Sequence, residues 1–160
     1  MEVIHTISPV FDENSKILIL GTMPSPKSRE VGFYYGHKQN KFWRVMSDLF
    51  NMGALDTIES KKKFLLDKKI ALWDTLKSCD IDKADDSTIK NPVVNDFSII
   101  FDKADIKKVF TTGKKAYALY TKHCLKFNKG AFCLPSTSPS NCRLKYEDLL
   151  AQYKIILDYL

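Results

Sequence analysis

Four short runs of β-branched and aliphatic residues constrain most strongly what this chain can fold into. The runs are Lys16–Gly21, Lys69–Trp73, Lys108–Thr112 and Ala131–Leu134, and each is followed directly by small or polar residues that favour a turn. Runs of this length and composition predict strands that are buried on both faces of a sheet. Such strands occur mainly in parallel sheets with helices packed on both sides.

Segments with helical hydrophobic spacing alternate with these runs. Phe42, Val45, Met46 and Leu49 recur at the spacing of one helix face, which predicts a helix over residues 40–50 with Asn40 as its N-cap. Further helices are expected over residues 60–67, 113–123 and 146–160. A polar loop is expected over residues 77–95, followed by a helix that Asn95 caps and that buries Phe97, Ile100 and Phe101.

This alternation of strands and helices predicts a three-layer α/β/α sandwich around a central, mainly parallel four-stranded sheet. The chain has 160 residues, a length at which one core buries roughly 70% of the surface of the unfolded chain. We therefore expect a single domain that spans residues 1–160 and a monomeric protein.

The cysteines and the N-terminus bear on the cellular compartment. Cys79, Cys124, Cys133 and Cys142 form no C-x-x-C pair, so they predict reduced thiols, with no metal ion and no cofactor. The N-terminal residues lack the pattern of an export signal, and no segment approaches about 18 apolar residues. We expect a cytoplasmic protein without a membrane partner.

The charge is compatible with a polyanionic partner. The formal net charge is +6, and 22 of the 25 basic residues are lysine, the others being Arg29, Arg44 and Arg143. This excess favours nucleic acid among the possible partners, although lysine also keeps many proteins soluble.

Ligands of parallel α/β sheets bind beyond the carboxyl ends of the strands. Here those ends lead into residues 21–26, 73–74, 111–113 and 134–141, which are rich in glycine, proline, serine and threonine. Such loops expose backbone N–H groups and small hydroxyls that can hold a phosphate, although they are also ordinary turn residues. We expect the two Pro-Ser loops to meet at one edge of the sheet and to form the binding site.

Aromatic and amide side chains are concentrated in residues 32–44, between the first strand and the first long helix. Aromatic rings next to amides suit a flipped nucleobase, which stacks on a flat ring and reads hydrogen-bonding groups. Phe42 and Trp43 are expected in the core, whereas Tyr34 and Tyr35 are more available. The chain has no G-x-S-x-G elbow, P-loop or dinucleotide fingerprint, which weakens the hydrolase and nucleotide-binding alternatives.

Four segments together resemble the uracil-DNA glycosylase superfamily, and specifically its hypoxanthine-DNA (deoxyinosine) glycosylase branch. They are Ile19-Leu-Gly-Thr-Met-Pro-Ser25, Gly32-Phe-Tyr-Tyr-Gly-His-Lys-Gln-Asn-Lys-Phe-Trp43, Ile70-Ala-Leu-Trp-Asp74 and Leu134-Pro-Ser-Thr-Ser-Pro-Ser-Asn141. The similarity runs in order along nearly the whole chain. Two positions depart from the wider family: Met23 stands where many relatives have Asp or Asn, and Lys38 where proline is common.

The resemblance implies a DNA glycosylase that flips a deaminated base, most of all hypoxanthine, out of DNA and hydrolyses its N-glycosidic bond. It implies that Asn40 is catalytic and orients the attacking water through its carbonyl, because the thioether of Met23 cannot do so. The implied base-binding residues are Tyr35, Tyr34, His37, Asn91 and Met23. The implied DNA-binding residues are Ser25, Ser136, Thr137, Ser138, Ser140, Asn141 and Arg143.

Three alternatives remain open at this point. The preferred base could be uracil, because uracil and hypoxanthine both present an N–H beside a carbonyl. The protein could bind nucleic acid without catalysis, since Met23 replaces the usual polar residue. Asn40 could also be an ordinary N-cap without a chemical role.

Overall fold

A computed structural model of residues 1–160 contains a central parallel sheet of four strands. The strands are β2 (Ile17–Gly21), β3 (Ile70–Asp74), β6 (Lys108–Thr112) and β7 (Ala131–Leu134), in the spatial order β3-β2-β6-β7. Every residue of β2 and β3 is buried, which explains why their sequences are continuous apolar runs. The four predicted strands are confirmed to within a residue.

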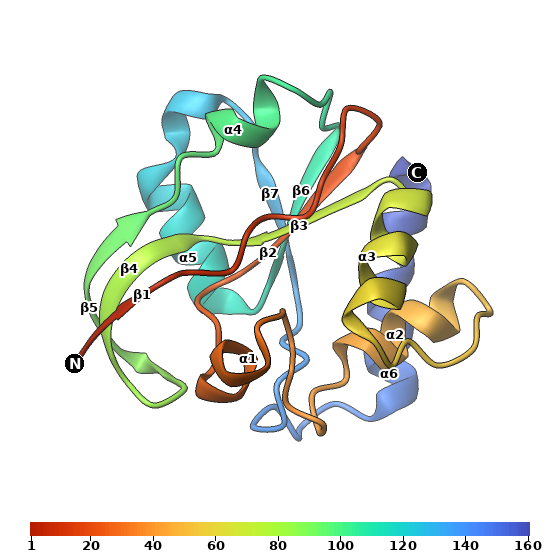
Figure 1. Cartoon of the computed structure of the whole chain (residues 1–160), viewed down its shortest axis with the longest axis horizontal. Coiled ribbons are helices and arrows are strands. Elements are labelled where there is room, and N and C mark those ends of the chain that lie inside the picture. The colour runs from red at the N-terminus through yellow and green to blue at the C-terminus, as the bar shows by residue number, and fades with distance from the viewer.

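Helices cover both faces of this sheet (Figure 1). On one side lie α2 (Phe42–Leu49), α3 (Ile58–Asp67) and α6 (Tyr146–Tyr153), and on the other lie α4 (Ser98–Phe101) and α5 (Lys114–His123). Two 3₁₀ helices, η1 (Leu125–Phe127) and η2 (Lys154–Tyr159), follow α5 and α6. The expected three-layer α/β/α architecture is therefore confirmed. No helix is both long enough and apolar enough to cross a membrane.

The main core lies between the sheet and its helices and includes Phe42 and Trp43, as predicted. Phe42 is fully buried and Trp43 nearly so. The Trp43 indole donates a hydrogen bond to the Tyr34 carbonyl at 2.9 Å. This bond and the burial fix the start of α2 against the segment that precedes it.

The expected polar loop over residues 77–95 is wrong. This segment forms a hairpin of β4 (Leu76–Asp82) and β5 (Asp85–Val94), and β1 (Glu2–Ile4) pairs with β4 to complete a second, antiparallel sheet. About half of its residues are exposed, and only Leu76, Cys79 and Ile81 are buried. A strand pair with so little apolar surface has the composition of a loop.

The helix ends also differ from the prediction. Asn95 does not cap α4, which begins after Phe97; its amide instead donates to the carbonyls of Asp74 and Leu76, at 2.9 and 3.1 Å. The first long helix begins at Phe42 rather than Asn40. A short helix, α1 (Pro26–Val31), begins in the first Pro-Ser loop, where no helix was expected.

Candidate active site

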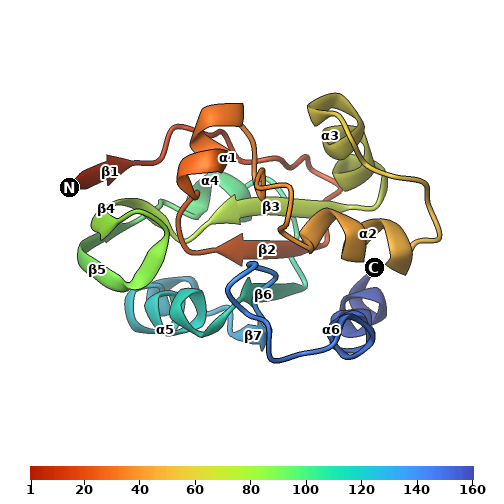
Figure 2. The same cartoon turned by 90° about the horizontal axis from the view of Figure 1, so that it is seen from below.

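A mostly polar cavity opens at the carboxyl ends of the central strands. Figure 2 looks onto this edge, where the segment before α2 and the loop after β7 lie side by side. The cavity holds about 710 Å³ of space, which includes open solvent at its mouth. Its walls are formed by Gly21, Thr22, Met23, Pro24, Ser25, Ser28, Tyr34, Tyr35, Asn40, Asp74, Ile81, Ala84, Asp86, Thr112, Ser136, Thr137 and Ser138.

Gly21, the last residue of β2, lets two side chains approach the floor of the cavity. A Cβ atom at this position would lie 2.5 Å from Asp74 Oδ1 and 3.2 Å from the Tyr35 hydroxyl oxygen. The Gly21 carbonyl also accepts a hydrogen bond from the Thr75 hydroxyl at 2.9 Å. Any residue larger than glycine at this strand end would therefore displace the Asp74 carboxylate.

Asp74 is held by a histidine from the far end of the chain. His5 Nε2 lies 2.8 Å from Asp74 Oδ2, and both side chains are almost completely buried. The Ile7 N–H donates to His5 Nδ1 at 3.3 Å, so Nδ1 acts as an acceptor and Nε2 carries the proton that is donated to Asp74. Sequence reasoning did not connect these two residues, because 69 positions separate them.

Tyr35 lies on the wall of the cavity in a backbone conformation that only a few non-glycine residues adopt, with φ at 52°. One face of its ring stacks on Phe42, with the ring centroids 4.0 Å apart. Its hydroxyl is 3.0 Å from the Thr112 hydroxyl. Burial, and then the nearby charge of Asp74, raise the pKa of the Tyr35 phenol far above its ordinary value, so the group stays neutral.

Tyr34 is more deeply placed than Tyr35. Its ring is buried, and its hydroxyl donates to the carbonyls of Ser8 and Ile7, at 2.9 and 3.2 Å. It forms part of the cavity wall, but these two bonds engage its polar group within the protein. Tyr35 is therefore the more accessible ring of the pair.

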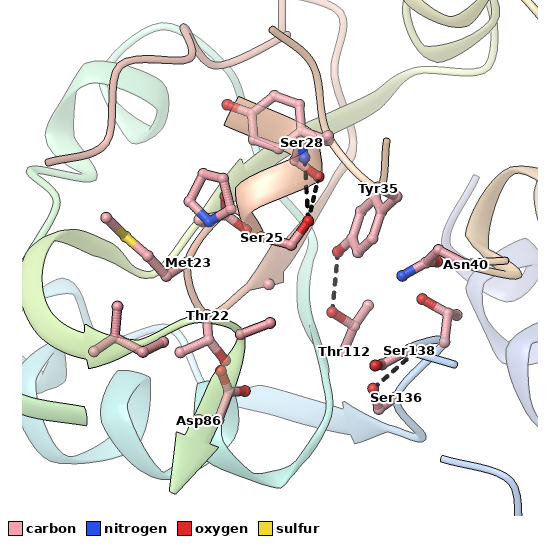
Figure 3. A pocket seen from close by; sticks show the side chains of 17 residues that line it. Thr22, Met23, Ser25, Ser28, Tyr35, Asn40, Asp86, Thr112, Ser136 and Ser138 are labelled. Carbon is pink, nitrogen blue, oxygen red and sulfur yellow. Dashed lines mark hydrogen bonds between the residues drawn. The ribbon is translucent and has the colours of Figure 1, made fainter. Parts of the chain in front are cut away.

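Asn40 presents its amide nitrogen to the cavity (Figure 3). Its Oδ1 accepts a hydrogen bond from the Phe42 N–H at 2.9 Å, and this donor fixes which end of the amide is oxygen. The side chain thus accepts a hydrogen bond from the first residue of α2. This is the bond that an N-cap residue makes, although the helix begins later than predicted. The sequence analysis expected the Asn40 side-chain carbonyl to orient a water molecule. In the structure this carbonyl points to the helix instead.

The two Pro-Ser loops meet at this cavity, as the sequence predicts. Ser25 accepts from the Ser28 N–H at 3.1 Å and caps α1. Ser136 accepts from the Ser138 N–H at 3.1 Å, and the Lys41 N–H donates to the Thr137 carbonyl at 3.1 Å. The last bond ties the loop after β7 to the residue that follows Asn40.

Met23 and Asp86 form the side of the cavity that faces the hairpin. Met23 is half-buried and packs against the small apolar cluster around Leu76 and Ile81. Asp86, at the start of β5, directs its carboxyl toward Thr22 (Figure 3). The sequence assigned no role to Asp86 or Thr112, because the hairpin that positions Asp86 was not recognised and Thr112 was placed only at the end of an apolar strand.

Several predicted site residues lie outside this cavity. His37 is exposed and lines a neighbouring groove. Asn91 is exposed, has φ at 52° where the hairpin register shifts, and donates to Asp80 at 2.7 Å. Beyond the cavity, the loop after β7 continues through three further predicted residues: Ser140 bonded to Ser138, Asn141 bonded to the Ser136 carbonyl, and exposed Arg143.

Comparison with known proteins places this chain in a family. The family model described as the uracil DNA glycosylase superfamily matches residues 8–159. The chain therefore belongs to the uracil DNA glycosylase superfamily.

Relatives and a solved structure agree with that assignment. The chain is 39% identical over 114 residues to a hypoxanthine DNA glycosylase of Methanosarcina barkeri, covering 68% of this chain and 70% of the relative. It is 34% identical over 136 residues to a hypoxanthine DNA glycosylase of Methanosarcina acetivorans, covering 84% and 85%. A solution NMR structure of a candidate uracil DNA glycosylase from Methanosarcina acetivorans has a TM-score of 0.80 and 29% identity, covering 98% of this chain and 99% of that chain.

Proposed function

We propose that this protein is an intracellular DNA glycosylase that removes hypoxanthine from deoxyinosine by hydrolysing the N-glycosidic bond of the flipped nucleotide. The observation that carries the proposal is the polar cavity in which the Asn40 amide nitrogen faces inward beside the ring of Tyr35. The two relatives named hypoxanthine DNA glycosylases support hypoxanthine as the preferred base.

The base would stack on the face of Tyr35 that Phe42 leaves free. Stacking of a base on an aromatic ring contributes about 1 to 3 kcal/mol. Ser25, Ser136, Thr137 and Ser138 would hold the phosphates that flank the lesion, because their loops offer small hydroxyls and backbone N–H groups at the cavity. Arg143, exposed further along the same loop, would contact the DNA outside the cavity.

Asn40 would act as a hydrogen-bond donor to the departing base. Cleavage of the glycosidic bond leaves negative charge on the purine and positive charge on the sugar. A donor held in place before the reaction stabilises such charge at no cost in reorganisation, and the bond from Phe42 holds Asn40 in that position. The start of α2 adds the positive end of its dipole.

Matched duplexes that contain a single deoxyinosine, a single deoxyuridine or no lesion test the proposal. After incubation with the protein, alkali cleaves the strand wherever a base has been removed. We expect cleavage at deoxyinosine. Cleavage only at deoxyuridine would assign the uracil alternative, and tight binding without cleavage of any duplex would assign the non-catalytic one.

A further inference from the structure

The cavity contains two acidic side chains, and only one of them is committed to the fold. Asp74 is bound to His5 on one oxygen and lies against Gly21 on the other. Asp86 also lines the cavity and forms no ion pair. Asp86 therefore supplies the carboxylate that is free to act on a bound substrate.

The hairpin places this carboxylate where water and substrate can both reach it. Taken as a whole, Asp86 is exposed to solvent, because it lies just after the turn between β4 and β5. Its carboxyl nevertheless points inward to the Thr22 hydroxyl, across the cavity from the Asn40 amide (Figure 3). A sugar held between these two groups would have a hydrogen-bond donor on one side and an anion on the other.

We propose that Asp86 is a catalytic carboxylate of this site, which accepts a proton from the attacking water and offsets the positive charge of the sugar. The inference rests on the proposed glycosylase function. The water oxygen bonds to the anomeric carbon of the sugar, and the bond to the base nitrogen breaks with its electron pair leaving on the purine. The water proton passes to Asp86 and then to solvent, from which the purine takes one proton to become neutral hypoxanthine.

The surroundings of Asp86 suit a proton acceptor. Burial is the main cause that raises the pKa of its carboxyl, and the charges of Asp74 and Asp85 raise it further, whereas the hydrogen bond from Thr22 and the charge of Lys115 lower it. The balance is a pKa above the ordinary value of 3.8. A carboxylate with a raised pKa is a stronger base nearer to neutral pH.

Asp86→Asn tests the inference, and Asp85→Asn is the matched control. Asp85 is the neighbouring residue, and its Oδ1 accepts from the Ser87 N–H and hydroxyl, two bonds that an asparagine oxygen can keep. In single-turnover cleavage of the deoxyinosine duplex, we expect Asp86→Asn to lower the rate by about 100-fold or more and Asp85→Asn to leave it near the wild-type value. Affinity for the uncleaved duplex should not fall in either variant, because each substitution only removes a negative charge.

The pH dependence separates proton acceptance from a structural role. The reactive form is ionised, so the wild-type rate should rise with pH through the raised pKa of Asp86 and then level off, and Asp86→Asn should lose this rise. A small carboxylate such as formate should restore cleavage by Asp86→Ala in a concentration-dependent way, which a folding defect would not allow.

Two sets of results would overturn the inference, and they are distinguishable. If the wild type cleaves deoxyinosine and Asp86→Asn cleaves it equally fast, or if the wild-type rate falls as pH rises through the same range, Asp86 is not the proton acceptor while the proposed function stands. If the wild type cleaves none of the three duplexes, the proposed function and this inference fail together.

Discussion

At the scale of single residues, the two ends of the Asn40 amide lie in different surroundings. Its oxygen bonds the Phe42 N–H, and its nitrogen faces the cavity. Asn40→Asp keeps the acceptor and removes the donor, so stability should change little while the rate falls by about 100-fold or more. Asn40→Ala should lose the rate and also about 1 kcal/mol of unfolding free energy.

Single-turnover cleavage and urea unfolding, measured on both variants, check this prediction. If Asn40→Asp cleaved at the wild-type rate, the oxygen would be the functional end of the amide and the donor role would be wrong. If Asn40→Ala folded and cleaved at the wild-type rate, the only role of Asn40 would be to cap the helix.

Gly21→Ala should damage the cavity without touching any group that reacts. The added methyl group would meet Asp74 Oδ1 at 2.5 Å, so the carboxylate or the strand end must move, at a cost of about 1 to 3 kcal/mol. We expect lower thermal stability and slower cleavage. Gly53→Ala is the control, since nothing lies within 4 Å of a Cβ atom there; equal effects of the two substitutions would contradict the prediction.

At the scale of elements, β1 matters because His5, the residue that follows it, holds the Asp74 carboxylate on the cavity wall. His5→Ala leaves the buried Asp74 carboxylate without its donor and should lower the unfolding free energy by about 2 to 3 kcal/mol. His5→Gln can still donate and should recover part of the loss. Urea denaturation measures both effects. If His5→Ala left the unfolding free energy unchanged, Asp74 would not depend on this bond.

The predictability of each element follows from its burial. The strands of the central sheet could be predicted because both of their faces are covered, which requires continuous apolar runs such as Ile17–Gly21. The hairpin could not, because β5 has no buried residue and its pairing with β4 depends on backbone bonds that any polar sequence can make.

Some parts of the site could likewise be predicted from the sequence and others could not. Its loops after β2 and β7 could be placed together, because parallel strands bring their carboxyl ends to one edge of the sheet. Asp86 could not be placed, because its position depends on the hairpin, and the orientation of Asn40 could not, because it depends on one bond to Phe42.

At the scale of the whole molecule, the net charge of +6 predicts binding to DNA that weakens with salt. Raising the salt from about 50 mM to about 200 mM should weaken binding of an undamaged duplex by about tenfold or more, which corresponds to two or more phosphate contacts. Fluorescence anisotropy at several salt concentrations measures the slope. Arg143→Ala should make the slope shallower, and a flat slope in the wild type would argue against phosphate contacts.

The cavity draws its walls from positions as far apart in the chain as Gly21 and Ser138. During synthesis on the ribosome, a nascent chain that has not yet added β7 lacks the serines that complete one wall, even if its earlier strands have already paired. The capacity to excise a base would therefore arise only after the ribosome has added the loop that follows β7.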